Sequence, residues 1–150
     1  MPQAATEVQQ EIWVEASPET VFAYFTDPAR MVQWKGARAT LDPRPGGIYR
    51  VEINDRAIAR GEYVELSPPN RIVFTWGWEG GSNPVPPGSS QVEVDLVADG
   101  DGTIVRLTHR DLPEEERAAH ADGWRHFLGR LSETAAGRDP GPDPMAQAPE

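Results

Sequence analysis

Apolar and polar residues alternate along the stretch RIVFTWGWEGG, residues 71–81. The apolar side chains Ile72, Phe74, Trp76 and Trp78 take every second position. A period of two, in residues that are β-branched or aromatic, is typical of a strand with one buried face. Similar patterns predict further strands, which together form a curved antiparallel sheet of about six to seven strands. The predicted strands cover residues 7–15, 37–42, 47–53, 56–67, 71–78, 90–98 and 103–110.

Two short helices are predicted between the first and second strands. Ser17 and Asp27 stand directly before Pro18 and Pro28. A Ser or Asp side chain accepts hydrogen bonds from the free N–H groups of a first helical turn, and proline fits the first helical position. The sequence therefore predicts helices that begin at these prolines, the second ending near Gly36.

A long amphipathic helix is predicted within residues 112–137. Its first turn is acidic, and the side chains of one stripe recur at spacings of three and four. Gly123 lies inside it, where glycine costs about 1 kcal/mol relative to alanine. Its missing side chain serves close packing against a strand or leaves room for a ligand. The stripe consists of Arg117, His120, Ala121, Trp124, Phe127, Leu128 and Leu131.

The order of these elements predicts one α+β domain. The simplest packing lays the long helix across the concave face of the sheet. We expect a flexible N-terminus over residues 1–7, the domain over residues 8–135, and a disordered, proline-rich tail over residues 136–150. The tail has no apolar periodicity, so it cannot bury enough surface to offset the entropy of ordering it.

The tryptophans of residues 71–81 either fill a core or line a cavity. Phe74, Trp76 and Trp78 are expected to face the long helix, with Tyr49 and Val51 beside them on a neighbouring strand. Indole and phenol groups carry a polar atom that needs a partner, and aromatic walls with a few polar groups are typical of small-molecule cavities. We predict that Trp76 lines a cavity and that Trp78 lies nearer its mouth.

Three polar side chains and one more tryptophan are candidates for the same cavity. His109 at the end of the last strand and His120 on the long helix are either titrating groups in the cavity or hydrogen-bonded structural histidines. Trp124 shares the inner stripe of that helix. Arg60 is expected to turn inward and hold a ligand carboxylate, with an internal contact to Glu62 as the competing interpretation.

Composition narrows the classes of function. The formal net charge of −10 opposes nucleic acid and anionic membrane surfaces. Cysteine is absent, and His120 and His126 are six residues apart and so face different ways on a helix. We therefore expect no metal and no cofactor. No serine or threonine stands in a nucleophile motif, and lysine occurs once, at Lys35. Without a leader-like start or an 18-residue apolar run, a cytoplasmic location is the expectation.

Four phrases carry a family resemblance: ASPETVFAYFTDPARMVQW, GGIYRVE, GEYVELSPPNRIVFTWGWEG and HADGWRHFLGRL. Over residues 8–134 the chain resembles the START-like (SRPBCC) superfamily, and most of all its bacterial branch homologous to the activator of heat-shock protein 90 ATPase. The resemblance implies the helix-grip fold, in which the long helix and the sheet enclose a cavity for an apolar ligand. Members of this superfamily include lipid carriers, hormone receptors and aromatase/cyclases, so the resemblance alone selects no single activity.

Three hypotheses of function follow. The first, which the residues favour, is binding or carriage of a small hydrophobic or aromatic molecule without covalent chemistry. The second is a cyclase- or aromatase-like enzyme with His109 or His120 as general base. The third is a partner of a chaperone ATPase, and a homodimer is a further alternative. A buried acid–histidine pair favours the enzyme, an apolar cavity favours the carrier, and a filled cavity beside an exposed apolar patch favours the partner protein.

Overall fold

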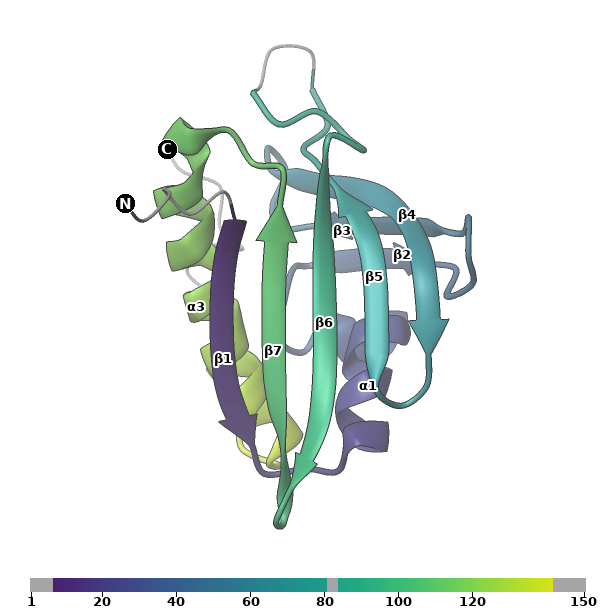
Figure 1. Ribbon diagram of the computed structural model, residues 1–150, viewed down its shortest axis with the longest axis vertical. Helices are drawn as coiled ribbons and strands as arrows, with labels where there is room; N and C mark the ends of the chain where they lie inside the picture. The colour runs from purple at the N-terminus through teal and green to yellow at the C-terminus, as the bar shows by residue number, and fades with distance from the viewer. Residues whose placement is uncertain (1–6, 81–83, 142–150) are drawn as a thin grey trace, which may run out of the picture.

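A seven-stranded antiparallel sheet dominates the computed structural model, which describes residues 7–80 and 84–141 (Figure 1). Its strand order is β1-β7-β6-β5-β4-β3-β2, and every neighbouring pair is antiparallel. Only β1 joins the sheet beside a strand distant in the sequence. The strands are β1 (Glu7–Val14), β2 (Arg38–Leu41), β3 (Ile48–Glu52), β4 (Ile58–Ser67), β5 (Arg71–Trp76), β6 (Ser90–Asp99) and β7 (Gly102–Arg110).

The two short helices begin at the predicted prolines. The helix α1 (Pro18–Thr26) is capped by Ser17, whose hydroxyl accepts from the Thr20 N–H at 3.2 Å. The helix α2 (Pro28–Met31) is capped by Asp27, whose carboxylate accepts from the Ala29 N–H at 3.0 Å. These caps satisfy N–H groups that a helix start leaves without a partner, so the local signal read from the sequence is confirmed.

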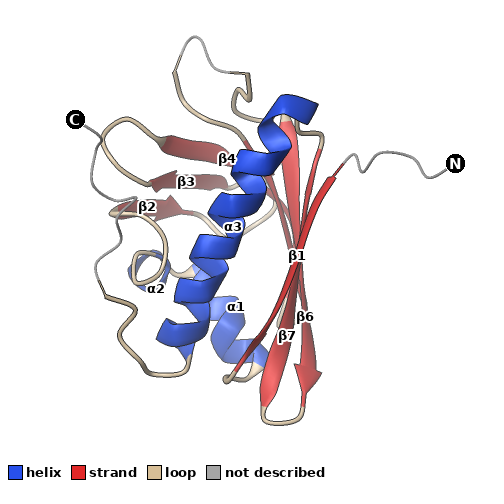
Figure 2. Ribbon diagram, turned by 90° about the vertical axis from the view of Figure 1, so that its left-hand side faces the viewer, coloured by secondary structure: helices blue, strands red, loops and turns tan. Residues whose placement is uncertain are grey.

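The long helix α3 (Glu114–Ala135) crosses the concave side of the sheet. Figure 2 shows it running between the half made by β1, β7 and β6 and the half made by β2, β3 and β4. Trp124, Phe127, Leu128 and Leu131 are all buried against the sheet. This arrangement confirms the predicted helix-grip fold. None of the described helices is long and apolar enough to cross a membrane.

The predicted inward face of β4 is wrong. The inward residues are Ala59, Gly61 and Tyr63, whereas Val64 is 47% exposed. A Cβ on Gly61 would overlap the carbonyl oxygen of Thr75 on β5, so only glycine fits this close approach. Small inward residues give a weak hydrophobic signal, and a register shift between Tyr63 and Glu65 interrupts the alternation as well.

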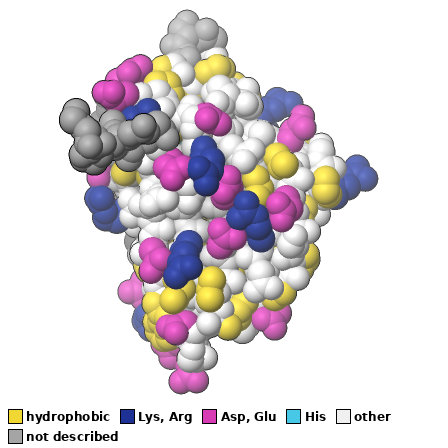
Figure 3. All heavy atoms as spheres, in the orientation of Figure 1, with side chains coloured by type: hydrophobic (Ala, Val, Ile, Leu, Met, Phe, Trp, Pro, Cys, Tyr) yellow, Lys and Arg dark blue, Asp and Glu magenta, His cyan; other side chains and the backbone are white. Residues whose placement is uncertain are grey.

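Charges of both signs cover the outer face of the sheet (Figure 3). Arg71 pairs with Asp95 at 2.8 Å, and Arg106 pairs with Glu11 at 2.8 Å. Exposed pairs of this kind contribute about 0–1 kcal/mol each. Their main consequence is therefore a mixed outer face, on which charged pairs lie beside exposed apolar side chains such as Trp13 and Val97.

The predicted terminal segments fall mostly outside the described residues. Residues 1–6 and 142–150 are not described, while Glu7 already pairs within β1. At the start of the tail, the Arg130 guanidinium on α3 donates to the Gly141 carbonyl at 2.9 Å. The first residues after α3 thus lie against that helix.

Candidate functional site

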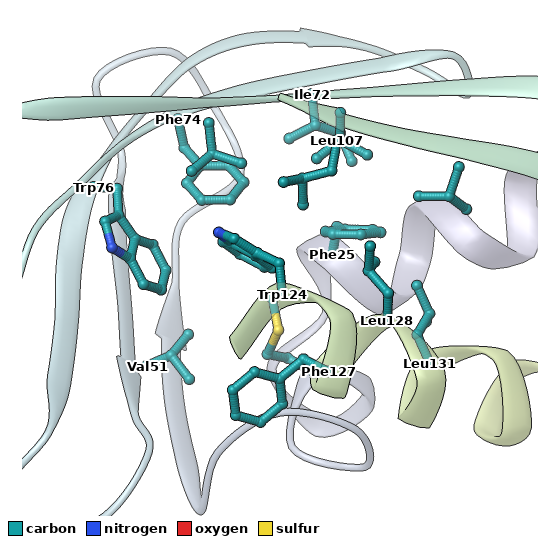
Figure 4. Packing of buried hydrophobic residues seen from close by; sticks show 14 of the residues in the cluster. Phe25, Val51, Ile72, Phe74, Trp76, Leu107, Trp124, Phe127, Leu128 and Leu131 are labelled. Carbon is teal, nitrogen blue, oxygen red and sulfur yellow. The ribbon is translucent and has the colours of Figure 1, made fainter. Parts of the chain in front are cut away.

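A cavity of about 350 Å³ lies between α3 and the concave face of the sheet. Most of its lining is apolar, and aromatic rings supply the largest surfaces. Figure 4 shows Trp76 from β5 and Trp124 from α3 pointing into the same region, with Val51 and Phe127 beside them. The lining residues are Lys35, Ile53, Asn54, Ala57, Trp76, Trp78, Ala119, His120, Gly123, Trp124 and Phe127.

Three tryptophans form one continuous aromatic wall. The ring centre of Trp76 lies 5.3 Å from that of Trp78 and 5.2 Å from that of Trp124. Trp76 is 3% exposed, whereas Trp78 is only half-buried. Between them, Gly77 has no room for a side chain, because a Cβ there would overlap the Pro86 carbonyl. The backbone of the following loop thus closes over the strand, and Trp78 lies where the cavity meets solvent.

The indole N–H of Trp76 has no partner. Trp76 Nε1 is the one buried side-chain nitrogen or oxygen, among the residues described, that makes no hydrogen bond. An unsatisfied buried donor costs about 1–3 kcal/mol. Natural cores rarely keep such a group without a reason.

His109 sits behind the wall in a hydrogen-bonded chain. Trp124 Nε1 donates to His109 Nδ1 at 3.0 Å, and His109 Nε2 lies 2.8 Å from Ser90 Oγ. Nδ1 accepts, so Nε2 must carry the proton and donate to Ser90, whose hydroxyl donates to the Trp76 carbonyl at 2.9 Å. Burial, reinforced by His120 and Lys35, lowers the pKa of His109 to about 3. His109 is thus a neutral structural histidine whose two nitrogens are both in use.

His120 lies on the cavity wall itself, and its nitrogens are also in use. Trp78 Nε1 donates to His120 Nε2 at 3.0 Å, and His120 Nδ1 lies 2.8 Å from the Glu116 carbonyl. These partners require Nδ1 to be the protonated nitrogen. The imidazole holds the Trp78 ring in place at the mouth of the cavity.

Lys35 is the unexpected member of the site. It follows α2, and its side chain is buried although it is the single lysine of the chain. Lys35 Nζ donates to Tyr49 Oη at 3.3 Å and lies 4.1 Å from the ring centre of Trp76 and 4.0 Å from that of Trp124. The next residue, Gly36, has φ +85° and no room for a Cβ beside Val51, which fixes the chain direction here.

Burial dominates the electrostatics of Lys35. Ring faces stabilise an ammonium by about 0.5–2 kcal/mol each, less than the several kcal/mol lost when an ammonium without a counter-ion leaves water. Burial accordingly lowers the pKa of Lys35 well below that of an ordinary lysine. Burial also raises the pKa of Tyr49 well above its usual value, so the phenol stays protonated.

The predicted site residues fall into three groups. Trp76, Trp78, His120 and Trp124 line the cavity. Tyr49, Val51, Phe74 and His109 are buried in the layer that supports it.

Arg60 forms the third group, and the prediction that it turns inward is wrong. Its side chain is 52% exposed and lies 3.6 Å from the Glu79 carboxylate, because Ala59 and Gly61 take the inward positions. Sequence reasoning also missed Lys35, for which the only signal was its being the sole lysine. A Cβ at Gly123 would meet nothing within 4 Å, so this glycine leaves open space rather than a packing contact.

Comparisons with known proteins agree with this architecture. The family model "Activator of Hsp90 ATPase homolog 1-like protein" matches residues 15–136. An AHSA1-like protein from Rhizobium etli is 46% identical, with a TM-score of 0.73, and the match covers 96% of this chain and 90% of that one. A comparison with curated protein sequences gave no match.

Two further similar structures are DynU16 and CalU16. DynU16, a protein in the dynemicin biosynthetic locus, is 26% identical with a TM-score of 0.78 over 91% of this chain. The present chain spans half the length of DynU16. CalU16 from Micromonospora echinospora is 27% identical with a TM-score of 0.71, and the match covers 87% of this chain and 76% of that one.

Proposed function

The chain belongs to the activator of Hsp90 ATPase homolog 1-like family, within the START-like superfamily, and from this premise we propose that its cavity binds a small apolar or aromatic molecule. The observation that carries the proposal is a cavity of about 350 Å³ whose wall includes the rings of Trp76, Trp78 and Trp124. A volume of this size is within the range of small-molecule sites. If these residues only formed a dry core, they would have closed this space and given the Trp76 N–H a hydrogen-bond partner.

The chemistry of the wall narrows the class of ligand. Three indole rings offer flat apolar surfaces, which favour a planar, aromatic molecule. The similarity to DynU16, a protein in a biosynthetic locus for a small molecule, points the same way.

The enzyme hypothesis finds less support in the geometry. A general base needs a nitrogen free to take a proton. Both nitrogens of His109 and both of His120 are engaged in hydrogen bonds within the protein. Protonation of either imidazole would break one of these bonds, so the two histidines hold the cavity in shape.

A chaperone-partner or homodimer role would need an exposed apolar surface. Trp13, Ile104 and Val97 form one cross-strand row on the outer face of β1, β7 and β6, with Trp13 45% and Val97 40% exposed. Sedimentation equilibrium tests the homodimer: a dimer that dissociates on Trp13→Glu supports it, and a monomeric parent chain argues against it. The open cavity leaves small-molecule binding as the better-supported function.

Calorimetric titration with 2-methoxynaphthalene, a flat apolar probe with one acceptor oxygen, tests the proposal. We expect saturable binding with one site per chain. Gly123→Leu should abolish it by filling the cavity, whereas Gly129→Leu, on the same helix and outside the cavity lining, should not. Trp76→Ala should weaken it, because one of the aromatic faces of the cavity wall is removed. Equal binding by the two leucine variants would refute the proposed site.

A further inference from the structure

Lys35 offers chemistry that the proposed binding function does not use. Its Nζ atom lies on the cavity wall between the rings of Trp76 and Trp124. Within the described residues it makes no ion pair, and its one hydrogen-bond partner is the phenol of Tyr49. An amine buried among aromatic rings without a carboxylate is a group whose neutral form the surroundings favour.

The neighbouring groups support the same protonation state. The titratable groups that face Lys35 are Tyr49 on β3 and His109 on β7. Neither supplies a negative charge, because burial raises the pKa of Tyr49 and lowers that of His109. The apolar surroundings lower the pKa of Lys35 itself. Lysines desolvated in this way become nucleophiles at neutral pH.

We propose that Lys35 binds an apolar aldehyde or ketone covalently and reversibly as an imine. This inference rests on the proposed function, since it requires that an aromatic molecule enters the cavity. It adds the class of ligand: one whose carbonyl group lies beside Lys35 Nζ while its rings lie on the tryptophans. The sequence shows no motif for a nucleophile, and it is the burial of the Lys35 amine that makes this side chain nucleophilic.

The covalent step balances without any further reactant. The lone pair of Nζ attacks the carbonyl carbon, a C–N bond forms, and the carbonyl π electrons move to oxygen. The Tyr49 phenol, 3.3 Å from Nζ, donates its proton to that oxygen and takes one from nitrogen. The carbinolamine then loses its hydroxyl group with the second N–H proton as water. The products are an imine and one water, and hydrolysis in the same cavity releases the ligand.

Reductive trapping provides a sharp test because Lys35 is the single lysine. The intact chain is incubated with 2-naphthaldehyde and cyanoborohydride at pH 7, and adducts are located by peptide mass spectrometry. The reduced imine should appear at Lys35, apart from any adduct at the α-amino group. Excess 2-naphthylmethanol, which has the same shape but no carbonyl, should suppress the Lys35 adduct by competing for the cavity.

An ordinary lysine within the same molecule supplies the reference rate. Arg106→Lys places a second amine on the outer face, where the Arg106 side chain is 55% exposed. At pH 7 only about one ordinary lysine in 2,500 is unprotonated. We expect Lys35 to be trapped about tenfold faster, or more, than the introduced surface lysine, because a larger fraction of Lys35 is unprotonated. Equal rates, or faster labelling of the surface amine, would overturn the inference.

Two variants and the alcohol probe separate the possible failures. Lys35→Met should remove the adduct, and Tyr49→Phe should slow trapping because the phenol carries the proton transfer. If the alcohol binds and the aldehyde is not trapped, the imine is refuted and the proposed function stands. If 2-naphthoate binds through Lys35 while the aldehyde is not trapped, the amine is a carboxylate partner and the inference fails. If neither the alcohol nor the aldehyde binds, both proposals fail.

Discussion

The buried imidazole of His109 predicts a specific loss of stability in acid. His109 is fully buried and neutral, because Nδ1 accepts from Trp124 and Nε2 donates to Ser90. Its pKa falls from 6.5 in the unfolded chain to about 3 in the folded protein. Between these two values the unfolded chain binds a proton that the native protein does not bind. Stability from this group is therefore fully present above pH 6.5 and is lost as the pH falls toward 3.

The size of the effect follows from the two pKa values. In that window each pH unit costs about 1.4 kcal/mol, so lowering the pH from 8 to 4.5 should remove roughly 3 kcal/mol through His109 alone. Carboxylates also titrate in acid. Glu79 and Glu93, for example, have pKa values lowered by their arginine partners. Their contribution is common to the parent chain and its variants, so the difference between chains isolates the imidazole.

The assay is urea unfolding followed by circular dichroism at pH values from 4.5 to 8. His109→Gln keeps a polar, non-titrating group at the site and should be less stable at pH 8. Its loss of unfolding free energy on going to pH 4.5 should be roughly 3 kcal/mol smaller than that of the parent. Leu131→Ala is the matched control, since it destabilises the core, takes part in neither hydrogen bond of His109 and should keep the acid loss. Parallel pH curves for the parent and His109→Gln would refute the reasoning.

Three further predictions concern stability. Trp124→Ala should lower the free energy of unfolding by about 3–5 kcal/mol, as measured by urea titration, because a buried aromatic is removed; a change below 1 kcal/mol would contradict its burial. Gly123→Ala and Gly129→Ala should each stabilise the protein by about 0.5–1 kcal/mol, because a Cβ at either site meets nothing within 4 Å; destabilisation at Gly123 alone would indicate a hidden contact. Ending the chain at Gly137 should shift Tm by less than about 5 °C, since the described contacts it removes are polar ones, mainly the exposed Arg138–Glu133 pair and the Arg130–Gly141 hydrogen bond; calorimetry showing a larger drop would mean that the tail docks.

Sequence patterns predicted the parts of the fold in which neighbouring residues alone determine what a side chain does, as in helix caps and strands with regular alternation. Ser17 and Asp27 each stand before a proline. At a helix start the Ser or Asp side chain accepts a backbone hydrogen bond and the proline fits the first helical position, so the pair predicts a cap. Along β5 every second residue is large and apolar, so the inward face is unambiguous. Trp76 and Trp78 both line the pocket between β5 and α3, and their roles as the wall and the mouth of a ligand cavity stay a prediction.

The parts that the sequence did not predict depend on contacts between distant segments. Gly61 carries no hydrophobic signal, yet it faces inward because the backbone of β5 approaches it. The alternation along β4 therefore predicts an inward face that is shifted by one residue, with Arg60 inside instead of Ala59 and Gly61. Lys35 lies outside any periodic element, and only the meeting of its loop with β3, β5 and α3 buries it. A periodicity analysis has no information on such a residue.

Arg60 was expected in the cavity and lies outside it, whereas Lys35 was not expected there and lines it. This exchange of an arginine for a lysine decides which chemistry the cavity can perform. An inward arginine would have remained charged at every ordinary pH and would have selected anionic ligands. A buried lysine is the basic side chain that can lose its charge, and the wall around it offers two indole faces and one phenol but no carboxylate among the described residues. Because the ring nitrogens of His109 and His120 already accept from tryptophan donors, Lys35 is the remaining basic residue of the cavity lining. Selection by this cavity should therefore favour a neutral carbonyl compound over an anion of the same shape.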